Sequence, residues 1–149
     1  MIEASRKIPT GFGSWPGFWQ EKQFPDWPHG GEVDIMEYYK GVIGLRIMDS
    51  HQNWTSGVVN LATLPSDWNT QFHVFTEVWD TTTIDLRMDG VLRNHYDVSN
   101  ADAGTFNPFR EPFFLILNYS LGGQSGGDPS NLPFPVKYEV DWVRAFQPQ

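Results

Sequence analysis

Glycine and proline interrupt this sequence throughout its length and leave no room for a long helix. The 149 residues include 14 glycines and 11 prolines, scattered along the whole chain, and both residue types break a helical period. Between them lie short runs in which apolar and polar residues alternate. Residues 84–88 are an example, because Ile84, Leu86 and Met88 alternate with polar residues as on a half-exposed strand. The sequence therefore predicts an all-β protein.

The expected strands are bounded by turn-forming residues. Asp89-Gly90 is a strong signal for a tight hairpin turn, and the almost wholly apolar segment 113–121 is typical of a strand inside a sandwich. Short strands with turns between them indicate a β-sandwich or jelly roll, in one domain that can bury a substantial core. Segments 100–111 and 122–135 are expected to be loops. The expected strands are residues 2–8, 15–21, 32–39, 43–49, 72–79, 84–88, 91–96, 113–121 and 138–146.

The composition narrows the range of partners. Acidic residues outnumber Lys and Arg by 18 to 10, and the net charge of −8 disfavours nucleic acid or an anionic membrane surface. Aromatic residues make up 15% of the chain and include seven Trp, a surplus that fits a neutral ligand. The absence of Cys excludes disulfides and thiolate metal sites. No apolar stretch approaches the roughly 20 residues of a membrane span, and no signal peptide opens the sequence.

One expected strand, residues 32–39, carries three carboxylates among apolar residues. Burying several negative charges side by side costs free energy, which suggests that they serve a function. Glu32 and Asp34 share a face because side chains two apart on a strand point the same way. Glu37 lies five positions after Glu32, so a regular strand would aim it at the opposite face. A β-bulge between Asp34 and Glu37 would return it to the shared face. The alternative is a merely solvated strand face, for which the apolar neighbours leave little room.

The bulge is expected at Ile35 and Met36, and it makes Glu32 and Glu37 the outer pair of an acid ladder. Cleavage of a glycosidic bond with retention requires a carboxylate nucleophile and a protonated carboxylic acid about 5–5.5 Å apart. The two outer Cα atoms would lie about 13 Å apart on a strand that rises about 3.3 Å per residue, and two long Glu side chains can lean inward. Asp34 between them would repel both charges and so raise at least one pKa, as a general acid requires.

The acid ladder resembles the bulged E-x-D-x-x-E signature of glycoside hydrolase family 16. Further segments are similar to motifs of that family in the same order, so the resemblance extends from about Ile2 to Gln147. These segments are Trp15-Pro16-Gly17-Phe18-Trp19, Asn107-Pro108-Phe109-Arg110, Phe114-Leu115-Ile116-Leu117-Asn118, Gly122-Gly123 and Tyr138-Glu139-Val140-Asp141-Trp142-Val143-Arg144.

The resemblance implies a jelly roll with a concave, sugar-binding sheet, and endo-hydrolysis of β-linked polysaccharides with retention. Carried over by position, Glu32 would be the nucleophile and Glu37 the acid/base, while Asp34 would hydrogen-bond the nucleophile. No cofactor is required. The bulged form is typical of laminarinase-like branches, whose substrates are β-1,3- or mixed β-1,3/1,4-glucans.

Two alternatives to a glucanase remain. Related branches cleave agar, porphyran or carrageenan, but these often sulfated galactans usually need basic residues in the cleft, and this chain is rich in acids. A carbohydrate-binding member of the family without useful turnover is the other alternative, although the intact acid ladder favours an enzyme. Because a polymeric substrate cannot enter a cell intact, a secreted, cell-surface or periplasmic location is expected.

Five residues are candidates for contact with the sugar, and each has a structural alternative. Trp15 and Trp19 share a strand face and could stack on sugar rings, or they could be core residues. Trp27, in a Pro-rich loop, could cover one end of the cleft. His51 lies where laminarinase-like members carry a cleft His, or on a polar surface loop. Asn118 interrupts an apolar strand, and its amide needs a partner, either a sugar hydroxyl or a structural hydrogen bond.

The resemblance also concerns a metal and the start of the domain. Family members often bind calcium with an Asp at the position of Asp141 and with backbone carbonyls near the chain start. The other ligands would lie in a segment that this sequence lacks, and a salt bridge or an exposed edge position would explain Asp141 equally well. Members usually carry further strands before Ile2. Residues 1–149 are therefore expected to form a single but partial domain with unpaired sheet edges. The remainder of a longer enzyme, another polypeptide or a second copy could complete the sheets. His73 and His95 are expected to be structural or surface residues.

Overall fold

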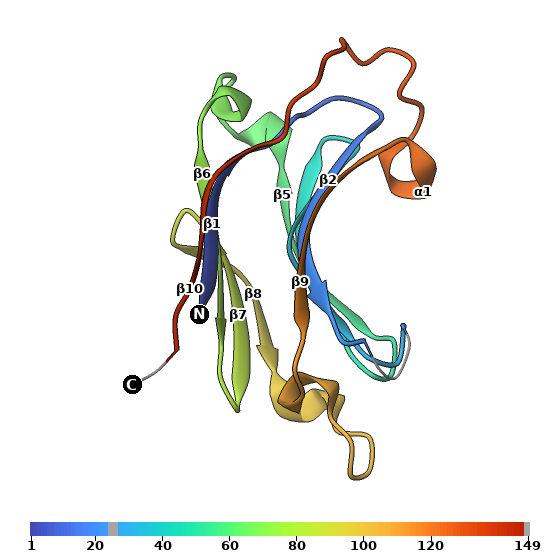
Figure 1. Cartoon of the computed structure of the whole chain (residues 1–149), viewed down its shortest axis with the longest axis vertical. Coiled ribbons are helices and arrows are strands. Elements are labelled where there is room, and N and C mark those ends of the chain that lie inside the picture. The colour runs from blue at the N-terminus through green and yellow to red at the C-terminus, as the bar shows by residue number, and fades with distance from the viewer. Residues whose placement is uncertain (24–26, 148–149) are drawn as a thin grey trace.

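The computed structural model describes residues 1–23 and 27–147, which form two antiparallel sheets packed face to face (Figure 1). The outer sheet has the order β10-β1-β6-β7-β8, with bounds of Glu139–Ala145, Ile2–Lys7, His73–Trp79, Thr83–Met88 and Val91–Asp97. The concave sheet has the order β5-β4-β3-β2-β9, with bounds of Trp54–Asn60, Val42–Met48, Glu32–Tyr39, Ser14–Glu21 and Phe114–Leu121.

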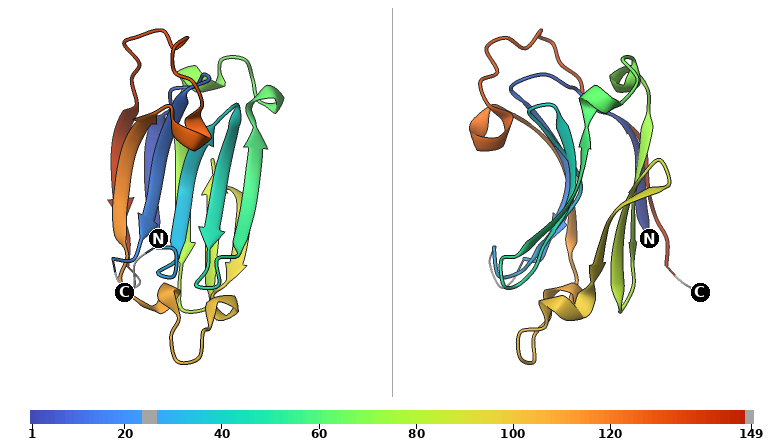
Figure 2. Two further views of the ribbon diagram at one scale, coloured as in Figure 1. Left: turned by 90° about the vertical axis from the view of Figure 1, so that its right-hand side faces the viewer. Right: turned by 180° about the vertical axis from the view of Figure 1, so that it is seen from behind.

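The concave sheet curves away from the outer sheet, so that its hollow side faces outward (Figures 1 and 2). Short helical turns lie in the connections and leave this hollow side uncovered along most of its length. They are Leu61–Thr63, Trp68–Thr70, Val98–Ala101, Pro108–Arg110 and the single-turn α1 at Gly123–Gly126. No helix in the described part of the chain is long and apolar enough to cross a membrane.

The core between the sheets sets which side chains face the hollow. On β4, Ile43, Leu45 and Ile47 are fully buried between the sheets, and burial of each such side chain stabilises the fold by roughly 1.5–3 kcal/mol. Because strand side chains alternate, Gly44 and Arg46 point to the hollow side instead. A slip of one residue would expose the apolar set, so the core fixes the register that positions the site.

The expected all-β sandwich is confirmed, and so is the hairpin turn after β7. Asp89 and Gly90 both have positive φ, at 50° and 78°, as a type I′ turn requires. One strand, β5, was not expected. Its sequence is WTSGVVN, in which Gly57 and polar residues hide the strand period. The expected loops 100–111 and 122–135 also contain short helical turns, so they are not wholly irregular.

The expectation that residues 113–121 form an interior strand is wrong in one respect. The segment does form β9, but β9 is the edge of the concave sheet and has β2 as its only strand partner among the described residues. Its apolar side chains are consequently exposed, with Phe114 at 43% and Leu117 at 41%. At the corresponding edge of the outer sheet, β10 exposes Val140 and Val143 at 40% each. The two open edges therefore carry apolar surface of the kind that normally pairs with further chain.

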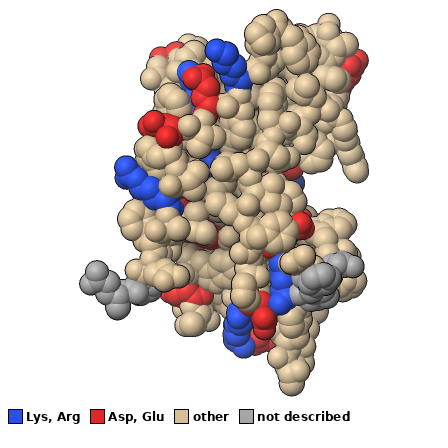
Figure 3. All heavy atoms as spheres, viewed as in Figure 1, with Lys and Arg blue, Asp and Glu red and all other residues tan. Residues whose placement is uncertain are grey.

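Charged side chains on the face shown in Figure 3 lie in small groups of mixed sign, separated by uncharged surface. The net charge of −8 is thus not concentrated into one acidic patch on this face.

Candidate active site

A bulge in β3 brings three carboxylates to the hollow side of the concave sheet. Opposite β4, Asp34 and Glu37 both remain paired, while Ile35 and Met36 together occupy the space of one residue, Leu45. Ile35 and Met36 are fully buried, so the extra residue is absorbed on the core side. The predicted bulge and its two residues are confirmed.

A pocket of about 240 Å³ opens over this acid ladder. Its walls combine carboxylates with indole rings, the combination that suits a polar ligand with apolar ring faces. The floor comes from three neighbouring strands, β3, β2 and β9. The lining residues are Trp15, Gly17, Trp19, Glu32, Asp34, Glu37, Asn118 and Ser120.

An indole N–H holds each outer carboxylate of the ladder. Trp15 Nε1 donates to Glu37 Oε1 at 2.6 Å, and Trp27 Nε1 donates to Glu32 Oε2 at 2.5 Å. Hydrogen bonds to an ionised acceptor are short and strong. The two glutamates are thus oriented from different segments, β2 and the loop before β3, and Trp27 remains 57% exposed at one end of the ladder.

A second hydrogen-bonded chain forms the wall on the β9 side. Trp19 Nε1 donates to Asn118 Oδ1 at 2.9 Å, and Asn118 Nδ2 donates to Ser120 Oγ at 3.1 Å. A Cβ atom on Gly17 would lie 2.7 Å from Asn118 Oδ1, so only glycine lets this amide sit against β2. The structural hydrogen bond considered for Asn118 therefore exists, and the side chain lines the pocket as well.

Burial is the main cause of the raised pKa values of Asp34 and Glu32. It raises the pKa of Asp34 well above its usual range, and the charges of Glu32 and Glu37 raise it further, while Arg46 opposes the shift. Burial also raises the pKa of Glu32, against hydrogen bonds from Trp27 and Asp34 that lower it. The sequence attributed such a shift to repulsion alone. The pKa of Glu32 is raised as expected, but by desolvation, and the expected cause is wrong, because the interaction with Asp34 lowers this pKa.

The carboxyl groups of Glu32 and Asp34 shift each other's pKa in opposite directions. Two carboxyl groups can share a hydrogen bond only if one of them is protonated. The interaction between the two carboxyl groups lowers the pKa of Glu32 and raises that of Asp34, so Asp34 is the one of the two that holds a proton more readily.

Arg46 contacts the acid ladder, and the sequence did not predict this contact. Its Nη1 lies 3.5 Å from Glu37 Oε2, and its guanidinium lies over the ring of Tyr39 at 4.6 Å. A single Arg on the polar side of a strand is commonplace and predicts nothing by itself. Its alternation with buried Leu45 and Ile47 does place it on the same face as the acids.

Three predicted site residues lie outside the pocket lining. Trp27 reaches Glu32 from one end of the ladder, whereas His51 and Asp141 lie farther away. The backbone N–H of His51 donates to Asp49 Oδ1 at 2.8 Å in the turn between β4 and β5, and its side chain is 46% exposed. Asp141 is exposed at the point where the β1–β10 register shifts. Within residues 1–23 and 27–147, no group of three or more His, Cys, Asp or Glu could hold a metal ion. The described side chains therefore offer no carboxylate cluster around Asp141, and calcium there stays a prediction.

The other two histidines that the sequence singled out contact the outer sheet. His73 stacks on Trp68 at 4.2 Å and bonds to Asp89, whereas His95 bonds to Asp85. Their expected structural or surface placement is confirmed.

The comparisons with known proteins agree with this geometry. A family model described as the XgeA-like, catalytic GH16 domain matches residues 1–84, a span that contains the acid ladder. This chain belongs to glycoside hydrolase family 16.

Three of its relatives show how far the likeness extends. The chain is 30% identical over 166 residues to glucan endo-1,3-beta-glucosidase A1 of Niallia circulans, covering 99% of this chain and 24% of that protein. It is 26% identical over 152 residues to keratan-sulfate endo-1,4-beta-galactosidase of Sphingobacterium multivorum, covering 98% and 36%. The laminarinase catalytic domain of Thermotoga maritima MSB8 superposes with a TM-score of 0.84 at 29% identity, covering 96% and 61%.

The family 16 jelly roll is therefore shown for this chain. The chain nevertheless spans only between about a quarter and six tenths of the length of these three proteins.

Proposed function

We propose that this protein is a retaining endo-β-glycoside hydrolase that cleaves β-1,3- or mixed β-1,3/1,4-glucans. The observation that carries the proposal is the acid ladder, in which two outer glutamates are each held by an indole N–H and flank an aspartate whose pKa is raised by burial. A pocket walled by tryptophans over such a ladder suits a sugar ring. The glucan is supported by the glucanase and laminarinase among the relatives.

Glu32 acts as the nucleophile in this proposal. Its carboxylate accepts a hydrogen bond from Trp27, and the contacts with Trp27 and Asp34 both lower its pKa against the effect of burial. It attacks the anomeric carbon and forms a covalent glycosyl-enzyme while the bond to the leaving sugar breaks.

Glu37 acts as the general acid and then as the general base. It gives its proton to the leaving glycosidic oxygen, and later takes a proton from the water that hydrolyses the glycosyl-enzyme, so the anomeric configuration is retained overall. The bond from Trp15 Nε1 fixes which oxygen of Glu37 faces the substrate. Trp15 and Trp19 line the same pocket, where their rings would stack on sugars bound beside the scissile bond. Because the substrate is a polymer, the enzyme would act outside the cytoplasm.

A β-galactan is the second candidate substrate. Arg46 places a cation beside Glu37 on the hollow side, although the acid-rich composition argued against basic residues there. One relative is named as an endo-galactosidase of keratan sulfate, so a sulfated or unsulfated galactan belongs in any substrate screen.

The proposal is tested by reducing-sugar release from laminarin, mixed-linkage barley glucan, agarose and porphyran. The wild type is compared with Glu32→Gln and with Glu21→Gln, since Glu21 is the cross-strand neighbour of Glu32 and does not line the pocket. Release from a glucan that Glu32→Gln abolishes and Glu21→Gln preserves supports the proposal, and a first product of β configuration by NMR supports retention. Folded protein that releases nothing from any polymer contradicts the hydrolase.

A further inference from the structure

Arg46 has hydrogen-bonding capacity that its protein surroundings leave unused. A guanidinium carries five N–H donors. Among the described residues, its closest carboxylate contact is Glu37 Oε2, 3.5 Å from Nη1, a distance too long for a charge-assisted hydrogen bond. Its Nε is buried and has no partner there. A buried donor without an acceptor costs free energy, so such a group points to an acceptor that arrives from outside.

The chain holds the Arg46 side chain flat along the floor of the hollow. A Cβ atom on Gly44 would lie 2.9 Å from Arg46 Nε and 3.4 Å from its Cδ, so the absence of a side chain at Gly44 provides the space for Arg46. The guanidinium then stacks on the ring of Tyr39 at 4.6 Å. Stacking on an aromatic face fixes the plane of the guanidinium while its edge donors stay free.

The surface beyond Arg46 is open toward β5. Ser56 pairs directly with Arg46 across the strands, and Val58 pairs with Gly44. Both are exposed, and the Arg46 side chain itself is 27% exposed. Apart from its buried Nε, the guanidinium therefore borders a solvent-accessible face that continues from the acid ladder.

A simpler role for Arg46 is charge compensation of the three acids. Arg46 does lower the pKa of Asp34, but this effect comes last among the causes of that shift. A guanidinium placed only to neutralise Glu37 would form the shorter, two-pronged pair that Arg and carboxylate readily adopt. The long contact with Glu37 and the stack on Tyr39 show that the guanidinium of Arg46 is not oriented for such a two-pronged pair.

We propose that Arg46 binds the substrate, donating hydrogen bonds to an oxygen of the sugar that flanks Glu37, either a hydroxyl or a sulfate ester. The inference rests on the proposed function and adds a specificity-determining residue to it. Both kinds of oxygen accept from a guanidinium, and a sulfate matches its fork.

The test measures glycan binding in a Glu32→Gln background, where nothing is cleaved. Tryptophan fluorescence, which reports on Trp15 and Trp19, gives dissociation constants for laminarihexaose and for keratan sulfate before and after desulfation. Arg46→Met removes the donors at similar length, Arg46→Lys keeps only the charge, and Gly44→Ala displaces an intact Arg46. Arg87→Met is the matched control, because Arg87 lies on the outer sheet and bonds to Asp85.

We expect Arg46→Met and Gly44→Ala to weaken binding at least fivefold, Arg46→Lys to fall between, and Arg87→Met to have no effect. A loss larger for sulfated than for desulfated keratan identifies the oxygen as a sulfate, and an equal loss identifies a hydroxyl. Should Gly44→Ala fail to fold, the two Arg46 variants carry the test.

If folded Arg46→Met binds the glycans as the parent does, the inference is wrong, while the proposed function stands. The inference is also wrong if Arg46→Met in the active enzyme lowers kcat at constant KM. If the Glu32→Gln parent binds none of the probes, the proposed function and this inference fall together.

Discussion

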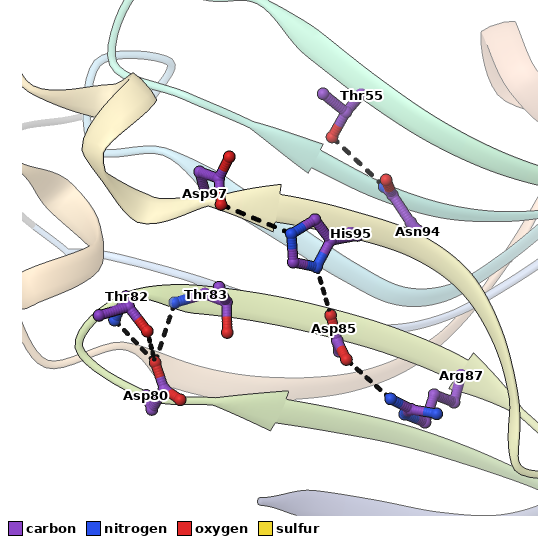
Figure 4. A network of polar contacts seen from close by, with 9 residues as sticks. All are labelled: Thr55, Asp80, Thr82, Thr83, Asp85, Arg87, Asn94, His95 and Asp97. Carbon is purple, nitrogen blue, oxygen red and sulfur yellow. Dashed lines mark hydrogen bonds and ion pairs between the residues drawn. The ribbon is translucent and has the colours of Figure 1, made fainter.

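Carboxylates on the two sheets of the sandwich have opposite electrostatic surroundings. On the outer sheet, Asp85 Oδ1 meets His95 Nδ1 at 2.7 Å and Asp85 Oδ2 meets Arg87 Nη2 at 2.7 Å, while His95 Nε2 lies 3.5 Å from Asp97 (Figure 4). The hydrogen bond from His95 lowers the pKa of Asp85, with Arg87 adding to the shift, and the bond to Asp85 raises the pKa of His95. Each charge in this exposed network has a partner of opposite sign.

On the concave sheet, the acids face one another and tryptophans. Burial raises the pKa values of Glu32 and Asp34, and Arg46, the cation beside Glu37, is poorly placed to form a hydrogen bond. A network that satisfies every charge contributes to stability, if only slightly, whereas a ladder of buried acids opposes folding. The difference teaches that a cluster of acids does not by itself indicate a functional site. Acids held in an energetically unfavourable position do indicate one, because only a function explains why such a position is retained.

The comparison is tested most severely by removing the outer acids of the ladder one at a time. We expect Glu32→Gln and Glu37→Gln each to lower polysaccharide cleavage on the order of 10⁴-fold, since both chemical steps need both groups. A dinitrophenyl glycoside separates the two roles, because its leaving group departs without protonation. Glu37→Gln should keep its first step on this substrate, seen as a burst of dinitrophenol, and Glu32→Gln should lose it. Identical behaviour of the two variants would contradict the assigned roles.

Asp34 is expected to have the next largest effect. Asp34→Asn keeps a donor to Glu32 but loses the carboxyl proton, whereas Asp34→Ala removes the donor. A hydrogen bond to a charged group contributes about 1.5–3 kcal/mol, so we expect Asp34→Ala to lower kcat/KM roughly ten- to a hundredfold and Asp34→Asn to lower it less. Steady-state kinetics on the best glucan measures both. Equal losses would mean that the proton of Asp34, and not its hydrogen bond, is essential.

The pH dependence of activity sharpens the account of Glu32. Because burial raises its pKa, the acid limb of kcat/KM should lie above the usual range of a glutamate, and activity should fall as pH drops through it. The bond from Trp27 lowers this pKa, so Trp27→Phe should move the acid limb to higher pH. Trp54→Phe is the control, since Trp54 is also an exposed tryptophan but lies on β5, two strands away from Glu32. An acid limb that stays in place in Trp27→Phe would contradict the role of this bond.

The sequence could predict those features of the site that arise from residues close together in the chain, but not those that depend on contacts between distant strands. The ladder was predictable because strand periodicity and one bulge are local, and Glu32, Asp34 and Glu37 lie within six residues. The contact of Arg46 with Glu37 was not, because it depends on the space above Gly44 and on a ring of another strand. The strand β5 escaped notice because Gly57 lies against Arg93 of β8, where an ideal Cβ would be 2.0 Å from the Arg93 carbonyl oxygen. That close approach between sheets explains the glycine, but only the folded chain reveals it.

Substitutions in the outer network are expected to have the smallest effect on stability. The effect of Asp85 on stability should also change with pH in the opposite direction to that of Asp34. Asp85→Asn should change the free energy of unfolding by less than about 1 kcal/mol and leave activity unchanged. Since the pKa of Asp85 is lowered on folding, its contribution is lost as pH falls through that pKa. The pKa of His95 is raised, so its contribution is lost as pH rises through it. The network thus contributes most between the ordinary pKa values of Asp and His, 3.8 and 6.5.

Asp34 should show the reverse, because a raised carboxyl pKa makes stability fall as pH rises. Urea unfolding of Asp85→Asn and Asp34→Asn from pH 4 to pH 8 compares the two regions directly. Relative to the wild type, Asp34→Asn should gain stability toward the alkaline end, while Asp85→Asn should lose a little near the middle of the range. If the two variants changed the pH profile in the same direction, the contrast between the paired outer acids and the buried ladder would not hold.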